Sequence, residues 1–323
     1  MRKAGNRVRV TAQLIEASTV HHVWADKYDR DLDDIFAIQD GITDHIVGAL
    51  EPAMEDAEQR RTLMKQPDSL DAWEAGLRGF WHFHQASQTE NESAIGWFNK
   101  SINLDPQFAL SHGGLAMAYL AGMMSGWLPS NDETIVKLRL AGQKTIELAP
   151  TSARGRLAEG WARILSGQHG PGIEEVERAI EINPSFTPGY HYLGVVLWMA
   201  GRPKEAIEAI DRCLRLNPAD QAYPRMLGVK SASYIMLGDY VKAVELATIA
   251  TERAPEFPLA HRNLANALAR LGRIEESHSA LKEFMRLAPN YLIKALRGRF
   301  PWRDDDTFEQ FAEGLRKAGL PEG

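Results

Sequence analysis

Short amphipathic helix ends followed by a proline recur along most of the chain. These prolines stand at Pro106, Pro150, Pro184, Pro218, Pro255 and Pro289, at spacings of 44, 34, 34, 37 and 34 residues. A repeat of about 34 residues is the length of one helix–turn–helix unit, and such units bury their apolar faces only by stacking on one another. The pattern therefore predicts an array of six helical hairpins over residues 69–289. The predicted units are 69–106, 107–150, 151–184, 185–218, 219–255 and 256–289.

The fourth unit shows the reason for the pattern best. Gly194 and Ala206 are small enough to let its two helices approach closely, Gly201 ends the first helix in a left-handed turn, and Pro218 stops the second. The second unit has about ten extra residues, which we place between Gly122 and Glu133. That insertion includes the apolar residues Met123, Met124, Trp127 and Leu128. It either folds back on the first repeats or forms a second binding surface.

The period and the positions of small residues resemble the tetratricopeptide repeat. This resemblance implies an α-solenoid whose concave groove is formed by the first helix of each hairpin and binds a peptide or helix of another protein. By repeat register, the groove candidates are Met117, Leu120, Arg154, Leu157, Trp161, Ile164, His191, Val195, Trp198, Ile235, Arg262 and Asn266. Two interpretations of Trp161 and Trp198 stay open. They bind a partner, or they pack between repeats or under the chain's own tail.

The two ends of the chain do not follow the repeat. In the N-terminal segment, residues 1–62, polar and apolar side chains alternate over residues 7–15 and again over 20–28, which predicts an antiparallel β-hairpin. A helix capped by Asp33 or Asp34 is expected next. In the C-terminal segment, residues 290–323, an N-cap cluster beginning at Asp304 opens an amphipathic helix with Phe308, Phe311 and Leu315 on its apolar face. We expect this helix to cap the array. The fold class is thus mostly α.

The run RKAGNRVRVTAQLIEASTVHHVWADKYDRDLDDIFAIQDGITDHIVGALEP resembles the second half of a TolB-like α/β domain. The closing residues 311–322 are similar to the usual ending of bacterial proteins that join a class III adenylate cyclase to such a domain and to tetratricopeptide repeats. The resemblance implies a signalling role. It does not imply catalysis by this chain, because the effector domain and the first half of the TolB-like domain are missing from the sequence.

Composition narrows the choice of partners and compartment. The net charge is −6, with 43 acidic and 37 basic residues, so no overall positive field favours nucleic acid. A lone cysteine, Cys213, fits a reducing compartment such as the cytoplasm. The longest apolar run, around Tyr192 to Ala200, is too short to span a membrane.

Candidate chemistry is weak throughout the sequence. Asp29, Asp31, Asp33 and Asp40 match part of a calcium-loop spacing, but Asp34 stands where that loop needs glycine. The histidine pairs His21–His22 and His82–His84 cannot chelate a metal ion, because adjacent strand residues and helix residues two apart face different ways. Cys213 stands where the repeat needs a small buried residue. We therefore predict no catalytic residue, cofactor or metal.

Three hypotheses about function follow. The first is a non-catalytic scaffold that binds a protein or peptide in the concave groove. The second is the regulatory C-terminal region of a cyclase-type or transcription-regulating signalling protein. The third is self-association through an unpaired strand near residues 7–16.

Overall fold

The computed structural model describes residues 2–4, 7–16, 21–31, 71–85, 87–217, 223–289 and 291–323. At the N-terminus, β2 (Arg7–Glu16) and β3 (His21–Asp31) form the expected antiparallel hairpin. A further strand, β1 (Arg2–Ala4), pairs with β2 over residues 7–9, so this part of β2 is not the free edge that the sequence suggested. The helix predicted after Asp33 lies outside the described residues.

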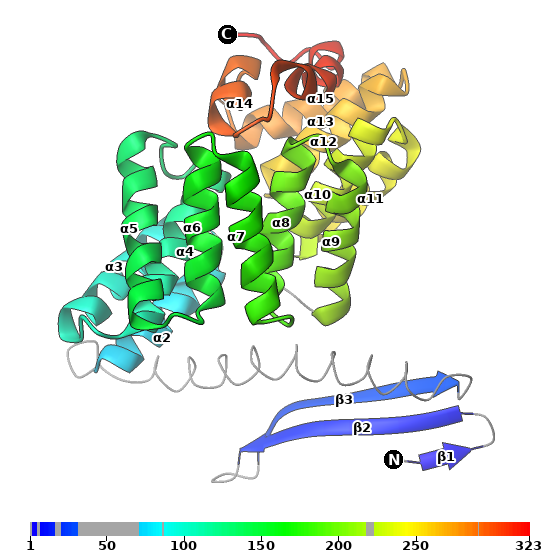
Figure 1. Ribbon diagram of the computed structural model, residues 1–323. Coiled ribbons are helices and arrows are strands. Elements are labelled where there is room, and N and C mark those ends of the chain that lie inside the picture. The colour runs from blue at the N-terminus through cyan, green and yellow to red at the C-terminus, as the bar shows by residue number, and fades with distance from the viewer. Residues whose placement is uncertain are drawn as a thin grey trace.

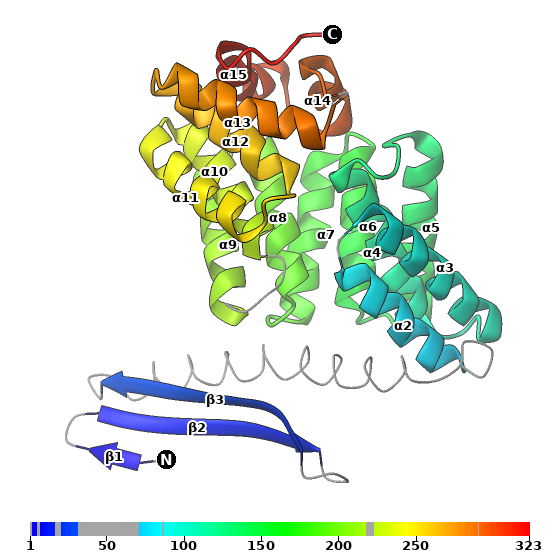
Figure 2. The ribbon, with the colours of Figure 1, turned by 180° about the vertical axis from the view of Figure 1, so that it is seen from behind.

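Twelve helices form the predicted hairpins, and each hairpin packs on the next (Figures 1 and 2). In pairs they are α2 (Ala72–His84) with α3 (Gln88–Leu104), α4 (Ala109–Ser125) with α5 (Asp132–Leu148), α6 (Ala153–Leu165) with α7 (His169–Ile182), α8 (Thr187–Met199) with α9 (Pro203–Leu216), α10 (Tyr223–Leu237) with α11 (Tyr240–Arg253), and α12 (Pro258–Arg270) with α13 (Ile274–Leu287). The helical solenoid expected from the 34-residue period is confirmed.

Glycine has the role predicted for it inside the hairpins. Gly201 adopts a φ of 72°, in the left-handed region where a side chain would be strained. At Gly194 a Cβ atom would lie 2.7 Å from the Ile210 side chain, and Ala206 is fully buried. These residues therefore set how closely α8 and α9 approach.

The insertion in the second hairpin lengthens the helices on both sides of the turn. Both α4 and α5 have 17 residues, whereas α8 has 13. The turn begins at Gly126, with a φ of 78°, within the stretch between Gly122 and Glu133 where the sequence placed the extra residues. Leu128 then folds back onto Gly122, where an added Cβ would lie 2.6 Å from it. The insertion thus packs on its own hairpin.

Two helices follow the last hairpin, α14 (Ile293–Arg299) and α15 (Asp305–Lys317). The side chain of Asp304 accepts a hydrogen bond from the Thr307 backbone N–H, so the predicted N-cap is confirmed. The apolar face of α15 is buried, as expected. It packs against α12 and α10, the first helices of the sixth and fifth hairpins, as seen at the red end of the chain in Figure 1. The sequence did not predict α14.

Candidate functional site

The segment from Tyr291 to the C-terminus, here called the tail, lies across the ends of three first helices. Its hydrogen bonds run from Arg303 N to Met199 O (3.2 Å), from Arg303 Nη1 to Ala200 O (3.1 Å), from Gln310 Nε2 to Met236 O (2.8 Å), and from Asn266 Nδ2 to Phe311 O (2.8 Å). The residues that bond to the tail lie in α8, in the turn after α8, in α10 and in α12. The tail therefore occupies part of the concave face of the array.

Trp198 is the centre of this contact. Its ring lies edge-on to three tail residues, with centroid distances of 6.4 Å to Phe300, 5.0 Å to Trp302 and 5.1 Å to Phe311. Only 4% of Trp198 is exposed. The sequence left open whether Trp198 binds a partner or packs between repeats or under the chain's own tail. In the structure, the tail covers it.

Most of the groove candidates are on the expected helices but covered. Nine are buried, namely Met117, Leu120, Leu157, Trp161, Ile164, Trp198, Ile235, Arg262 and Asn266. Trp161, for example, packs edge-on against Tyr192 of the next hairpin at 5.6 Å. Arg154, His191 and Val195 are partly exposed. The other nine are covered because neighbouring first helices and the tail fill the inner side of the array around them.

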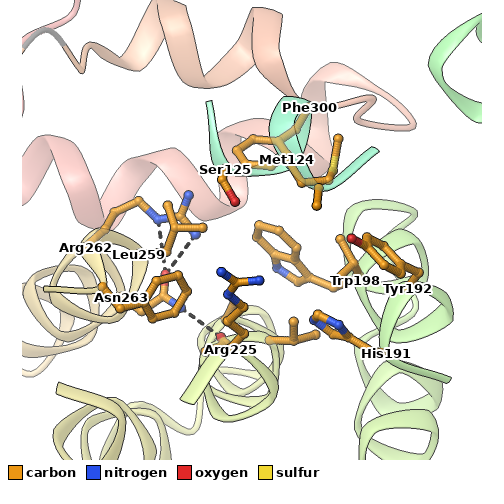
Figure 3. Close-up of a pocket in the computed structure, with 16 residues that line it drawn as sticks. Met124, Ser125, His191, Tyr192, Trp198, Arg225, Leu259, Arg262, Asn263 and Phe300 are labelled. Atoms are coloured by element: carbon orange, nitrogen blue, oxygen red, sulfur yellow. Dashed lines mark hydrogen bonds between the residues drawn. The ribbon is translucent and has the colours of Figure 1, made fainter. Parts of the chain in front are cut away.

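A pocket of about 90 Å³ remains open on the inner side (Figure 3). Its walls come from the end of α4, from α8, α10 and α12, and from Phe300 of the tail. The lining residues are Ala121, Met124, Ser125, His191, Tyr192, Val195, Trp198, Arg225, Gly228, Val229, Ala232, Phe257, Leu259, Arg262, Asn263 and Phe300. Four groove candidates meet here: His191, Val195, Trp198 and Arg262.

The sequence did not indicate Arg225 or Asn263 as site residues. Arg225 lies in the first turn of α10, in the unit whose three extra residues obscure the repeat register. Asn263 follows Arg262 directly, and only the structure shows that its amide Nδ2 donates to Gly228 O at 2.8 Å. No sequence signal found above points to either residue.

Positive charge and buried donors characterise the pocket. Two arginines line it, and no aspartate or glutamate is among the described residues of its wall. Arg262 is held in place, because its Nε and Nη2 donate to Asn263 Oδ1 at 3.1 and 3.0 Å and its Nη1 donates to the Tyr291 hydroxyl at 3.3 Å. His191 keeps some exposed surface, but the side chains packed around its ring desolvate it, and this desolvation, with a smaller contribution from Arg225, lowers the pKa of His191 to about 4. His191 is therefore neutral at pH 7.

The structure also shows the surroundings of the residues that the sequence offered for metal or thiol chemistry. The described residues include no group of three or more His, Cys, Asp or Glu side chains placed to hold a metal ion. Cys213 is buried, and its Sγ donates to Thr187 O at 3.2 Å, which supports a packing role. Asp29 and Asp31 of the calcium-like spacing lie in β3, and its other members lie outside the described residues. Among the described helices none is long and apolar enough to cross a membrane.

Comparison with known proteins agrees with the architecture. Residues 188–220 and 233–291 match two family models described as tetratricopeptide repeat. These segments are tetratricopeptide repeats. Among solved structures with a similar tetratricopeptide-type fold, the APC/C hetero-tetramer Cut9–Hcn1 has a TM-score of 0.58 at 15% identity, covering 85% of this chain and 48% of that one. A monomeric mutant of IFIT1 with Gppp-AAAA also has a TM-score of 0.58 at 15% identity, covering 85% of this chain and 66% of that one. At this identity the likeness concerns the fold alone.

A curated relative is similar to part of this chain. It is "Putative adenylate cyclase 3" of Rhizobium meliloti (strain 1021), which is 28% identical over 169 residues. The match covers 51% of this chain and 29% of the relative. This chain thus spans under a third of that protein's length.

Proposed function

We propose that the protein is a non-catalytic scaffold that binds a peptide or helix of another protein on the inner face of its tetratricopeptide repeats. The observation that carries the proposal is the accessible stretch of that face around His191 and Val195, next to the pocket under Phe300. Arg154 is a further partly exposed candidate on α6. Apolar anchors in such a stretch supply most of the binding energy of a peptide.

The composition of the accessible stretch indicates a partner with apolar anchor residues. Val195, Met124 and Leu259 are partly exposed there, and each faces the same pocket. The buried candidates Trp161 and Trp198 are poor choices for a binding test, because truncating them would damage the packing of the array itself. A test needs a partly exposed residue.

Val195→Glu is the appropriate change, with Val241→Glu as its matched control. Val241 lies on α11, is 68% exposed and does not line the pocket. We expect Val195→Glu to lose at least roughly tenfold in affinity for partners captured by the wild-type chain, because the carboxylate would have to be buried on binding. Affinity purification with quantitative mass spectrometry measures this, and thermal unfolding verifies the fold of both variants. Equal capture by all three proteins would refute the proposal.

A second candidate function is a regulatory region of a cytoplasmic signalling protein. The similarity to the putative adenylate cyclase from Rhizobium meliloti favours it, as does the TolB-like resemblance of residues 1–62. The genomic DNA upstream of the Met1 codon tests it. An in-frame stretch encoding the missing strands and an effector domain is the expected result, and a stop codon close upstream would exclude it.

A further inference from the structure

The inner face of the last three hairpins already holds a helix of the chain itself. Along α15, Phe308, Phe311 and Leu315 stand at positions i, i+3 and i+7, and all three are buried. This is the arrangement by which an amphipathic helix lies in an apolar groove. We propose, on the basis of the scaffold function above, that the face under α15 is the binding site for an amphipathic helix of a partner protein, which the tail occupies as an internal competitor.

The hydrogen bonds between this face and α15 depend little on the sequence of the helix. Asn266 Nδ2 donates to Phe311 O at 2.8 Å. Arg270 Nη2, from the same helix as Asn266, donates to Gln310 O. Both acceptors are backbone carbonyls, which a helix of any sequence has. The face can therefore make the same two bonds to the helix of another protein.

Packing sets the side chains that such a helix needs. A Cβ atom at Gly314 would collide with Asn266 Oδ1, so this position requires a residue without a side chain. The buried positions on either side are Phe311 and Leu315. The preferred partner is thus a helix with two aromatic residues three positions apart, followed after three positions by glycine and after four by an apolar residue.

The tail is an imperfect occupant of this face. Among the described residues, Trp198 Nε1, Asn266 Oδ1 and Arg270 Nε are buried and make no hydrogen bond. All three side chains contact the tail, Trp198 through its ring pair with Phe311 and the other two through the bonds above. Each unmade bond weakens docking, because the buried atom has lost its bond to water and gained none in return. A partner helix whose side chains reach one of these atoms would bind more tightly than the tail.

The covalent link explains why the tail still holds the face in the free protein. A segment of the same chain competes at an effective concentration on the order of millimolar. A separate helix binds only the fraction of molecules whose tail is undocked, and its apparent affinity is reduced by that fraction. Loosening the tail should therefore strengthen the binding of a separate helix by the same factor.

A fluorescently labelled peptide of residues 300–318 is a suitable probe, because this sequence occupies the face in the structure. Its affinity for the full chain is measured by fluorescence anisotropy. We expect Trp302→Ala in the chain to raise that affinity at least roughly tenfold, since Trp302 belongs to the tail and not to the face beneath it. Arg303→Ala, which removes the bond to Ala200 O, should act in the same direction. Trp73→Ala, on α2, is the control and should bind the peptide as weakly as the wild type.

Two altered peptides test the fit to the face. The Phe311→Ala peptide should bind the Trp302→Ala chain at least roughly tenfold more weakly, because it lacks a fully buried anchor. The Gly314→Ala peptide should also bind more weakly, although alanine favours the helix, because its Cβ meets Asn266. Equal binding of all three peptides would overturn the proposal.

Two further outcomes would also overturn it. Equal peptide affinity of the wild type and both tail variants would mean that the tail does not compete. A concentration-dependent dimer of Trp302→Ala in sedimentation without peptide would make the tail of a second copy the occupant. These titrations need no cellular partner, so their failure is distinguishable from equal capture in the Val195→Glu experiment.

Discussion

At the scale of single residues, His191 shows how the pocket depends on pH. It lies beside Tyr192, whose pKa burial raises to about 12, and it shares the pocket wall with Arg225 and Arg262. Protonating His191 would put a third positive charge among groups that include no carboxylate in the described wall. The folded chain therefore resists protonation at this position.

The first prediction concerns stability against pH. The pKa of His191 falls from 6.5 in the unfolded chain to about 4 in the folded one, a difference of about 2.5 units. At about 1.4 kcal/mol per pKa unit, the neutral His191 contributes at most about 3.5 kcal/mol to the free energy of unfolding. This contribution is present above pH 6.5 and is lost as the pH falls toward 4. Urea unfolding at several pH values should show a weaker decline in His191→Gln than in the wild type. His278→Gln, at an exposed position on α13, should follow the wild type. A decline unchanged in His191→Gln would contradict this account.

Gly314 is a second residue whose surroundings give a clear expectation. A Cβ atom there would collide with Asn266 Oδ1, and Asn266 is held by its hydrogen bond to Phe311 O. Gly314→Ala should lower the free energy of unfolding by roughly 1–3 kcal/mol, because α15 must move away from α12. Gly298→Ala is the control, since nothing lies within 4 Å of its Cβ position. Denaturant unfolding measures both, and equal stability of the two variants would show that the close approach is unimportant.

At the scale of elements, local signals placed the helices well and their contacts poorly. The turn at Gly201 and the N-cap at Asp304 were found because each depends on neighbouring residues alone. The position of α15 depends on contacts between residues far apart in the sequence. Arg303, just before α15, donates a hydrogen bond to Ala200, 103 positions earlier. The spacing of apolar residues within a helix does not predict such contacts. The same limit applies to Trp198. Its position in the repeat predicts that it lies on the inner face of the array, but not that the tail covers it.

Trp302 provides a test of how firmly α15 is held. It is partly buried, and its ring lies 5.0 Å from Trp198 and 5.8 Å from Phe311. Trp302→Ala should speed amide hydrogen exchange in α15 by about tenfold or more while leaving α6 and α7 unchanged, since the lost contacts stabilise only the docked tail. Trp73→Ala, at a 47% exposed residue of α2, should leave α15 unchanged. Exchange that rises equally along the whole array would show that the tail is not a separate unit.

At the scale of the whole molecule, the tail changes what kind of array this is. In a simple solenoid each hairpin contacts only its neighbours, so stability is a sum of local contributions. Here one segment is bonded to the end of α8, to α10 and to α12, which links the fourth, fifth and sixth hairpins directly. We expect these three hairpins to unfold more cooperatively than the first three.

The order in which the chain is made gives the tail contact a further consequence. Ala200 emerges from synthesis 103 residues before Arg303, its hydrogen-bond partner. At roughly 5–20 residues per second, the aromatic surface at the end of α8 waits roughly 5–20 s for the segment that covers it. During that time Trp198 is open to any apolar segment nearby, including one from a neighbouring nascent chain. The order of synthesis, as well as affinity, therefore decides which segment first covers Trp198.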